Sequence, residues 1–141
     1  MALQKQITNI RTGHQNTYWR LTAISIDALS GHLQLVLSGY ASNAARQAGR
    51  LPDDQREWMF GPAVFGGIVQ APAAGGTLYD VNAIASYGLI RSTRRPLPPG
   101  AQTQESGDVL LPTGELIAAA DIEGMPDAPT IPSEFADAVD V

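Results

Sequence analysis

Few residues of this 141-residue chain have the types and spacing that chemistry requires. Asp53, Asp54 and Glu57 form one cluster of carboxylates, and such groups are used for acid–base catalysis or for holding a cation. Adjacent carboxylates generally diverge, however, and Arg56 stands among these three, which favours a solvated loop. A small hydrolase or carbohydrate-binding module that uses these carboxylates is the alternative from a different functional class.

The remaining candidates for chemistry are isolated. His14 falls in a predicted loop and His32 near a predicted turn, and neither has a positioned acid beside it in the sequence. Asp121, Glu123 and Asp127 lack the alternating ligands and the glycine of a calcium loop. No Gly-x-Ser-x-Gly elbow, Gly-x-x-x-x-Gly-Lys loop or His-Glu-x-x-His pair occurs. We therefore expect no enzyme, no catalytic residue, no metal site and no cofactor.

Composition limits the class of protein. The chain has no cysteine, which excludes disulfides, thiolate zinc sites and a cysteine nucleophile. Its length and its apolar fraction of 44% predict one folded domain with a real core. The N-terminal residues do not have the pattern of a signal peptide, and no apolar run reaches the length of a membrane span, so we expect neither.

The charges are divided unevenly along the chain. Residues 1–104 carry all nine basic groups and five acids, whereas residues 105–141 carry nine acids and no base. This division predicts an acidic arm that meets a basic surface, either on the body of the same chain or on a neighbouring copy. A solvated tail is the alternative. We expect no nucleic-acid partner, because the chain is acidic and its arginines form no single stripe, and no membrane partner.

The longest strand pattern, which any site must be built on, is a hairpin of residues 18–27 and 32–42. Residues 28–31 supply the Ser and Gly that a reversal needs. A period of two places three leucines on one face of the second strand: Leu33, Leu35 and Leu37. Two strands are only marginally stable alone, so further elements must cover this face.

Further elements are predicted on both sides of the hairpin. Strands are expected at residues 3–10 and 55–60, with a short one around 64–69. Residues 43–54 read as a long connection in which 44–48 make a helical turn.

One helix is predicted at residues 77–92. Thr77 and Asp80 fit a capping box, and the apolar stripe consists of Leu78, Val81, Ile84, Ala85 and Gly88. Arg91, Arg94 and Arg95 fall at or beyond its C-terminal end, where cations suit the helix dipole. We expect this helix to lie across the apolar face of the sheet.

The last third of the chain is rich in proline. Residues 96–100 are a predicted linker, and residues 108–111 and 115–121 form either a hairpin or a strand followed by a short helix. From residue 123 onward, prolines allow only an extended arm. The predicted fold is α+β, a mainly antiparallel sheet or sandwich with one amphipathic helix and an extended acidic C-terminal arm. Residues 1–95 form the β-rich part, and residues 96–141 belong to the same domain.

Large apolar residues have two possible roles. For the aromatic residues in strand-like segments, core packing is the first possible role and a subunit interface is the second. These residues are Tyr18, Trp19, Trp58, Phe60 and Phe65. On the arm, Phe135, Ala138 and Val139 are the predicted anchors. The interface candidates are therefore Tyr18, Trp19, Trp58, Phe135 and Val139.

Three segments carry a resemblance to a known family. They are residues 1–8 (Met-Ala-Leu-Gln-Lys-Gln-Ile-Thr), residues 18–21 (Tyr-Trp-Arg-Leu) and residues 132–141 (Pro-Ser-Glu-Phe-Ala-Asp-Ala-Val-Asp-Val). In this order they resemble a family of small tailed-bacteriophage proteins encoded among tail and baseplate genes. In this chain residues 92–131 stand between the predicted helix and the closing segment.

The resemblance implies a structural protein of the virion, without catalytic residues. Its partners would be other virion proteins and further copies of itself in a homo-oligomer. The tail or baseplate is the expected location, and a head decoration or cement protein is the alternative within the same class.

Overall fold

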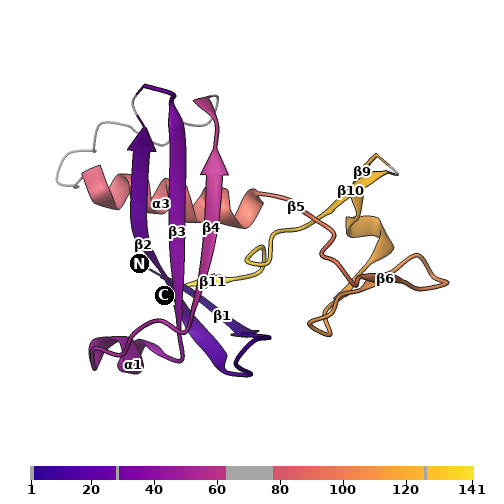
Figure 1. Cartoon of the computed structure of the whole chain (residues 1–141), viewed down its shortest axis with the longest axis horizontal. Helices are drawn as coiled ribbons and strands as arrows, with labels where there is room; N and C mark the ends of the chain where they lie inside the picture. The colour runs from indigo at the N-terminus through magenta and orange to yellow at the C-terminus, as the bar shows by residue number, and fades with distance from the viewer. Residues whose placement is uncertain (1, 28, 63–77, 126) are drawn as a thin grey trace.

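The computed structural model describes residues 2–62, except residue 28, and residues 78–141, except residue 126 (Figure 1). For residues 78–84 it describes the backbone alone. A five-stranded antiparallel sheet with one long helix forms the body, and two three-stranded sheets lie to one side of it. The predicted α+β fold with a mainly antiparallel sheet is confirmed. The predicted strand at 64–69, Phe65 and Thr77 of the capping box lie outside the described residues.

The main sheet has the strand order β11–β1–β2–β3–β4, with all neighbours antiparallel. Its strands are β1 (Leu3–Thr8), β2 (Gln15–Asp27), β3 (His32–Tyr40), β4 (Asp54–Phe60) and β11 (Val139–Asp140). The predicted hairpin is β2–β3. Its turn closes because the Asp27 carboxylate accepts hydrogen bonds from the Leu29 and Ser30 amides, while Gly31 adopts a positive φ of 70°.

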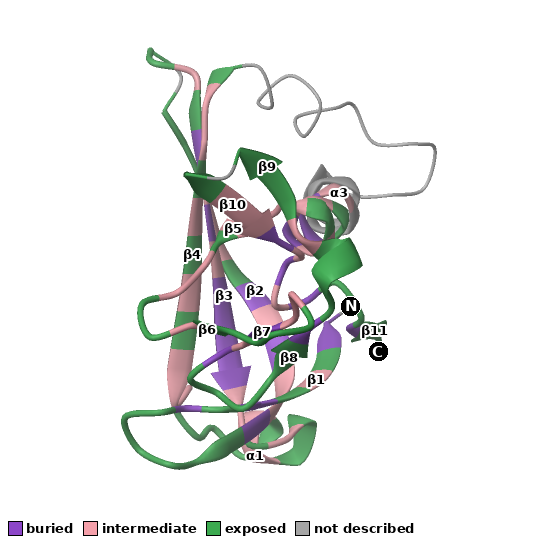
Figure 2. Ribbon diagram, turned by 90° about the vertical axis from the view of Figure 1, so that its right-hand side faces the viewer, coloured by how far each residue is buried: buried purple, intermediate pink, exposed green. Residues whose placement is uncertain are grey.

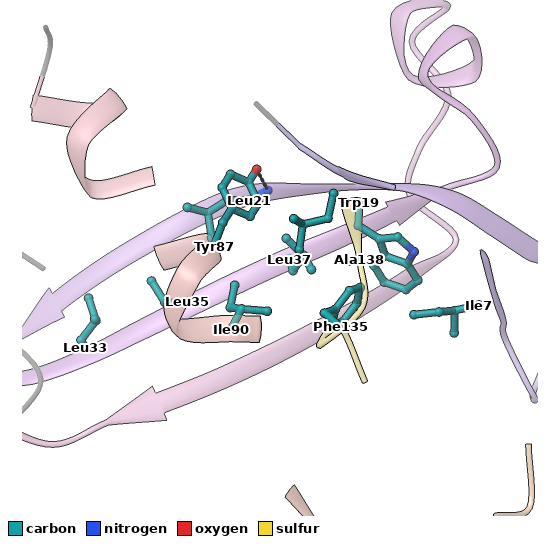
Figure 3. Packing of buried hydrophobic residues seen from close by; sticks show 11 residues of the cluster. Ile7, Trp19, Leu21, Leu33, Leu35, Leu37, Tyr87, Ile90, Phe135 and Ala138 are labelled. Atoms are coloured by element: carbon teal, nitrogen blue, oxygen red, sulfur yellow. Dashed lines mark hydrogen bonds between the residues drawn. The ribbon is translucent and has the colours of Figure 1, made fainter. Parts of the chain in front are cut away.

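The alternating leucines of β3 face the helix α3 (Leu78–Ser92), as predicted (Figure 3). Among the described side chains of α3, Tyr87 and Ile90 are the buried hydrophobic ones, and both lie over the sheet. The predicted apolar stripe is wrong here, because it contains Gly88, which is exposed, and neither of these two residues. The Tyr87 hydroxyl accepts a hydrogen bond of 2.8 Å from the Leu21 amide. The pairing of β2 with β3 shifts register just after Leu21. The hydroxyl of Tyr87 on the helix therefore satisfies a backbone N–H group at this irregular point of the sheet.

Trp19 is fully buried, and its position depends on a glycine in the neighbouring strand. Trp19 pairs with Gly39, and a Cβ atom at Gly39 would lie 2.7 Å from the indole ring. On the other side the Trp19 Nε1 donates to the Lys5 carbonyl at 3.0 Å. The glycine therefore provides the space in which the largest core side chain lies flat on the sheet.

Residues 43–54 contain the predicted helical turn as α1 (Asn43–Gln47). The Ser42 side chain caps it by accepting from the Ala45 amide at 3.1 Å. Across the described residues, no helix combines the length and apolar character that a membrane span needs.

Residues 97–131 form a second, smaller unit, which we call the lobe. Its short elements are β6 (Gln102–Thr103), β7 (Val109–Leu110), β8 (Leu116–Ile117), η1 (Ala119–Asp121), β9 (Glu123–Met125) and β10 (Ala128–Ile131). β7 and β8 form the predicted hairpin, and the 3₁₀ turn η1 follows it. β5 (Arg95–Pro96) pairs with β10 and so ties the predicted linker to the lobe. The lobe has its own core of Val109, Leu111, Ile117 and Ile131.

We expect Gly39→Ala to lower the free energy of unfolding by about 1–3 kcal/mol, because the added methyl group must displace the Trp19 ring. Gly88→Ala is the matched control, since a Cβ at this exposed helix position meets nothing within 4 Å. It should raise stability by up to about 1 kcal/mol through helix propensity. Urea unfolding measures both, and equal effects of the two substitutions would contradict the packing of Trp19 against Gly39.

Candidate functional site: the C-terminal clasp

The last ten residues return from the lobe to the main sheet and form what we call the clasp, residues 132–141. Phe135 is fully buried, and its ring centroid lies 5.2 Å from that of Trp19 (Figure 3). It lies 6.0 Å from the ring centroid of Trp58, and both contacts have edge-on geometry. Ala138 is buried in the same core. Aromatic burial of this kind is a large stabilising contribution, and it holds the end of the chain on the sheet.

Backbone and hydroxyl contacts complete the clasp. Ser133 Oγ donates to the Ile90 carbonyl at 2.6 Å and accepts from the Phe135 amide at 3.1 Å. It thereby satisfies one of the carbonyls that the end of α3 leaves open. Farther on, β11 pairs with β1, and Ala2 and Val141 exchange two backbone hydrogen bonds of 2.9 Å. The two ends of the chain are thus neighbours in one sheet.

Three carboxylates of the clasp each pair with a basic group of the body. Glu134 binds Arg56, with 2.9 Å between Oε2 and Nε. Lys5 pairs with Asp137, and Arg91 pairs with Asp140. The hydrogen bond from Lys5 lowers the pKa of Asp137 below its ordinary value.

Arg56 is the central cation of the clasp. It also binds Asp54 at 2.6 Å and lies 5.5 Å from the centre of the Trp19 ring. Burial alone would lower the pKa of Arg56, but the hydrogen bonds and charges of Glu134 and Asp54 raise it above its ordinary value. The guanidinium therefore joins β4, the clasp and the buried indole through one charged group.

The predicted acidic arm meets a basic surface on its own chain. Besides the three pairs of the clasp, Arg94 pairs with Glu123 at 3.5 Å and Arg95 with Glu115 at 3.2 Å. Arg94 also donates to the carbonyls of Asp121 and Thr130. The sequence predicted that Arg91, Arg94 and Arg95 would suit the helix dipole. In the structure Arg91 also binds the clasp, and Arg94 and Arg95 bind the start and end of the lobe.

A second polar cluster surrounds Asp53. His14 Nδ1 lies 3.1 Å from Asp53 Oδ1, while Thr12 and Asn16 donate to Oδ2, both at 3.3 Å. Asn9 donates to the Asp53 carbonyl at 3.0 Å. The expectation that His14 has no positioned acid is therefore wrong, because the loop between β1 and β2 folds onto the segment before β4.

The pKa of Asp53 is lowered. Burial opposes this shift, but hydrogen bonds from His14, Asn16 and Thr12 outweigh it by favouring the ionised carboxylate. The cluster joins the β1–β2 loop to the start of β4. It orients the imidazole of His14, whose side chain is 72% exposed.

The three carboxylates considered for catalysis do diverge. Asp53 faces His14, Asp54 binds Arg56, and Glu57 accepts a hydrogen bond from Gln34. Asp53 and Asp54 are not in a solvated loop, because their side chains are only 24% and 15% exposed. Within the described part of the chain, no three histidine or carboxylate groups gather in a way that could hold a metal ion.

The interface candidates fall into two groups. Trp19 and Phe135 lie in the core of the chain itself, so they are not on the surface of this structure. Trp58 and Tyr18 are partly buried, and Tyr18 contacts Tyr40 and Arg46. Val139 alone is largely exposed, at 63%. The anchors Phe135 and Ala138 dock within the chain, whereas Val139 faces outward.

Sequence reasoning missed the partners that hold the clasp. In the sequence, Arg56 is only a base among three acids, and no pattern there indicates a partner for Lys5 or Ser133. The charge division of the chain was the one signal that pointed to such pairs. It could not identify them, because each pair joins residues at least twenty positions apart.

No protein-family model matches the chain, and no curated protein or solved structure matches it.

We expect Phe135→Ala to lower the free energy of unfolding by about 3–5 kcal/mol, because it leaves a cavity between Trp19 and Trp58. Val139→Ala, also in the clasp but exposed, should change it by less than about 0.5 kcal/mol. Urea unfolding followed by tryptophan fluorescence provides the measurement. A Phe135→Ala protein as stable as the Val139→Ala protein would rule out the docked clasp.

Low pH should reduce the contribution of Asp53 to the stability of the fold. Because its pKa is lower in the folded chain than the ordinary value of about 3.9, the ionised form stabilises the fold above that pH. This contribution is lost as the pH falls through the folded pKa. Asp53→Asn should therefore be less stable than the parent protein at neutral pH, and the difference should shrink below about pH 4. Thermal unfolding across this range tests it, and a constant difference would contradict the assignment.

Proposed function

We propose that this chain is a structural component of a tailed-bacteriophage virion, that it belongs to the tail or baseplate, and that it acts by oligomeric assembly. The observation that carries the proposal is the convergence of the three segments on which the family resemblance rests. Residues 1–8, 18–21 and 132–141 are distant in the sequence, yet β1 lies between β2 and β11 in one sheet.

Contacts among the three segments support treating them as one structural motif. Lys5 of the first segment receives the Trp19 Nε1 hydrogen bond at its carbonyl and pairs with Asp137 of the third. Trp19 of the second segment packs against Phe135 of the third. The residues that carry the resemblance are thus engaged in holding the fold together, which is the role expected of signature residues in a structural protein.

The exposed surfaces of the body suit contacts with other chains. β4 ends the main sheet, and no described strand pairs with its outer edge (Figure 2). An open edge can receive a strand from a partner. Many copies arranged around a particle would strengthen individually weak contacts through avidity. Other virion proteins and further copies of the chain are the proposed partners.

The proposal is tested on purified particles of a phage that encodes this chain. Mass spectrometry should detect the chain in the particles at many copies, and a labelled copy should appear at the tail or baseplate in electron microscopy. Label on the head surface would instead favour a decoration protein. Absence of the chain from intact particles would overturn the virion role.

A further inference from the structure

The main sheet has one face that no described element covers. In Figure 1, α3 lies behind β2, β3 and β4, the lobe lies to one side, and no described element lies in front of these strands. We call this uncovered side the outer face. It carries the residues that alternate with the core leucines of β3, among them Gln34, Val36 and Tyr40, and their partners on β2 and β4.

The charges of the outer face are divided between its two halves. Arg20 lies in the half toward α1, where Arg46 also stands, 5.7 Å from the centre of the Tyr18 ring. Glu57 and Asp27 lie in the other half, toward the β2–β3 turn. The first half therefore carries two positive charges and the second half two negative ones.

These four charges are available to a partner. Across the described part of the chain, none of them forms an ion pair. Glu57 accepts a hydrogen bond from Gln34, and the Asp27 carboxylate accepts those of its own turn. Neither contact neutralises the carboxylate.

The side chains between the charges suit a protein interface. On β3 and β4 they are uncharged: Gln34, Val36, Ser38, Tyr40, Gln55 and Met59. Interfaces are depleted in Lys, Glu and Asp and enriched in Tyr, Met and Arg relative to the rest of a protein surface. The outer face therefore has the composition of an interface rather than that of a solvated sheet face.

The two halves also differ in shape and in aromatic content. The negative half contains a hollow that is lined, among others, by Ser25, His32, Gln34 and Met59. His32 stands opposite Asp27 and is counted as neutral at pH 7. The positive half carries the rings of Tyr18 and Tyr40, which contact each other edge-on.

We propose that two copies of the chain pack their outer faces against each other with their strands antiparallel, so that the positive half of each copy lies over the negative half of the other. This reversal brings Arg20 and Arg46 of one copy toward Glu57 and Asp27 of the second copy. Packing in the parallel sense would oppose like charges, which fixes the orientation.

The same reversal brings the tyrosines of one copy over the hollow of the other. Aromatic rings and thioethers make favourable contacts, so Met59 is a suitable partner for these rings. A second copy is the occupant that this face selects, because each half is the complement of the other half. The inference rests on the proposed function, since it supplies the self-contact that oligomeric assembly requires.

The outer face is large enough for such a contact. Four strands about 4.8 Å apart and the nine residues of β3 at about 3.3 Å each give a face on the order of 600 Å². Two copies would then bury on the order of 1,200 Å², which is the lower end of the range of stable interfaces. Sheets that pack face to face in this way form a β-sandwich with a layer about 10 Å thick between them.

The contact uses one surface twice, so it closes with two copies. The outer edge of β4 is not consumed by it and stays open for other chains. We therefore expect the isolated protein to be a dimer rather than a filament.

Sedimentation velocity on the full chain at several concentrations tests the contact. The parent protein should form dimers, and Met59→Asp should raise the dissociation constant about tenfold or more. Met125→Asp is the matched control, because Met125 lies on the lobe and is 68% exposed, close to the 64% of Met59. This control should dimerise as the parent does.

A charge exchange tests the orientation of the two copies. Arg20→Glu alone places like charges opposite Glu57 of the second copy, and Glu57→Arg alone places like charges opposite Arg20. Each variant should dimerise at least tenfold more weakly than the parent, and an equal mixture of the two should recover dimers, because both charge pairs are then complementary. Arg11→Glu, in the β1–β2 loop, is the control and should leave the dimer unchanged. Circular dichroism should first establish that all variants are folded.

Two results would overturn this dimer. One is a parent protein that stays monomeric at every concentration, which would leave the outer face to a different partner. The other is a mixture of the two folded charge variants that associates no better than either variant alone. Detection of the chain in purified particles tests the proposed function separately, so the failure of one can be told from the failure of the other.

Discussion

The packing of Phe135 between Trp19 and Trp58 is the interaction on which the rest of the structure depends. Trp19 lies flat on the sheet because Gly39 opposite it has no side chain, and its indole nitrogen is bound by the backbone of β1. The aromatic ring of Phe135 packs against Trp19, whose position is fixed by these two contacts. Without this contact, β11 would be held beside β1 by two residues of strand pairing, the two hydrogen bonds between Ala2 and Val141, and the ion pairs of Asp137 and Asp140.

Charge and apolar burial act together at the clasp. Each carboxylate of the clasp that pairs with the body lies close to Phe135 in sequence, so docking of the ring brings the ion pairs into range. Arg56 is the clearest case, because its guanidinium contacts two carboxylates and lies over the Trp19 ring. Pairs that are partly buried in this way are screened by salt less than exposed ones. The pairs of Arg56 should therefore be less sensitive to salt than the more exposed pair of Lys5 and Asp137.

The ion pairs within the chain also determine what remains for other molecules. They use the bases nearest to the clasp and the root of the lobe, whereas four arginines have no ion pair with a described carboxylate: Arg11, Arg20, Arg46 and Arg50.

The sequence by itself determined the local elements. Alternation of leucines predicted β3 and its buried face, Ser and Gly predicted the turn before it, and the helical spacing of apolar residues at 77–92 predicted a helix across the apolar face of the sheet, although not the residues by which it packs. These features follow from neighbouring residues, and short-range periodicity is enough to specify them. The division of charge likewise predicted that an acidic arm would meet a basic surface.

Only the tertiary structure decided which residues meet across the chain. Periodicity could not place Phe135 against Trp19, because the two are separated by more than a hundred residues. In addition, both aromatic residue types occur in protein cores and in subunit interfaces. Nor could it give His14 its carboxylate, because Asp53 reaches it only after two loops have folded together. Contacts of this kind depend on how the strands are ordered in the sheet, and strand order is settled by the packing of the whole chain rather than by any one segment.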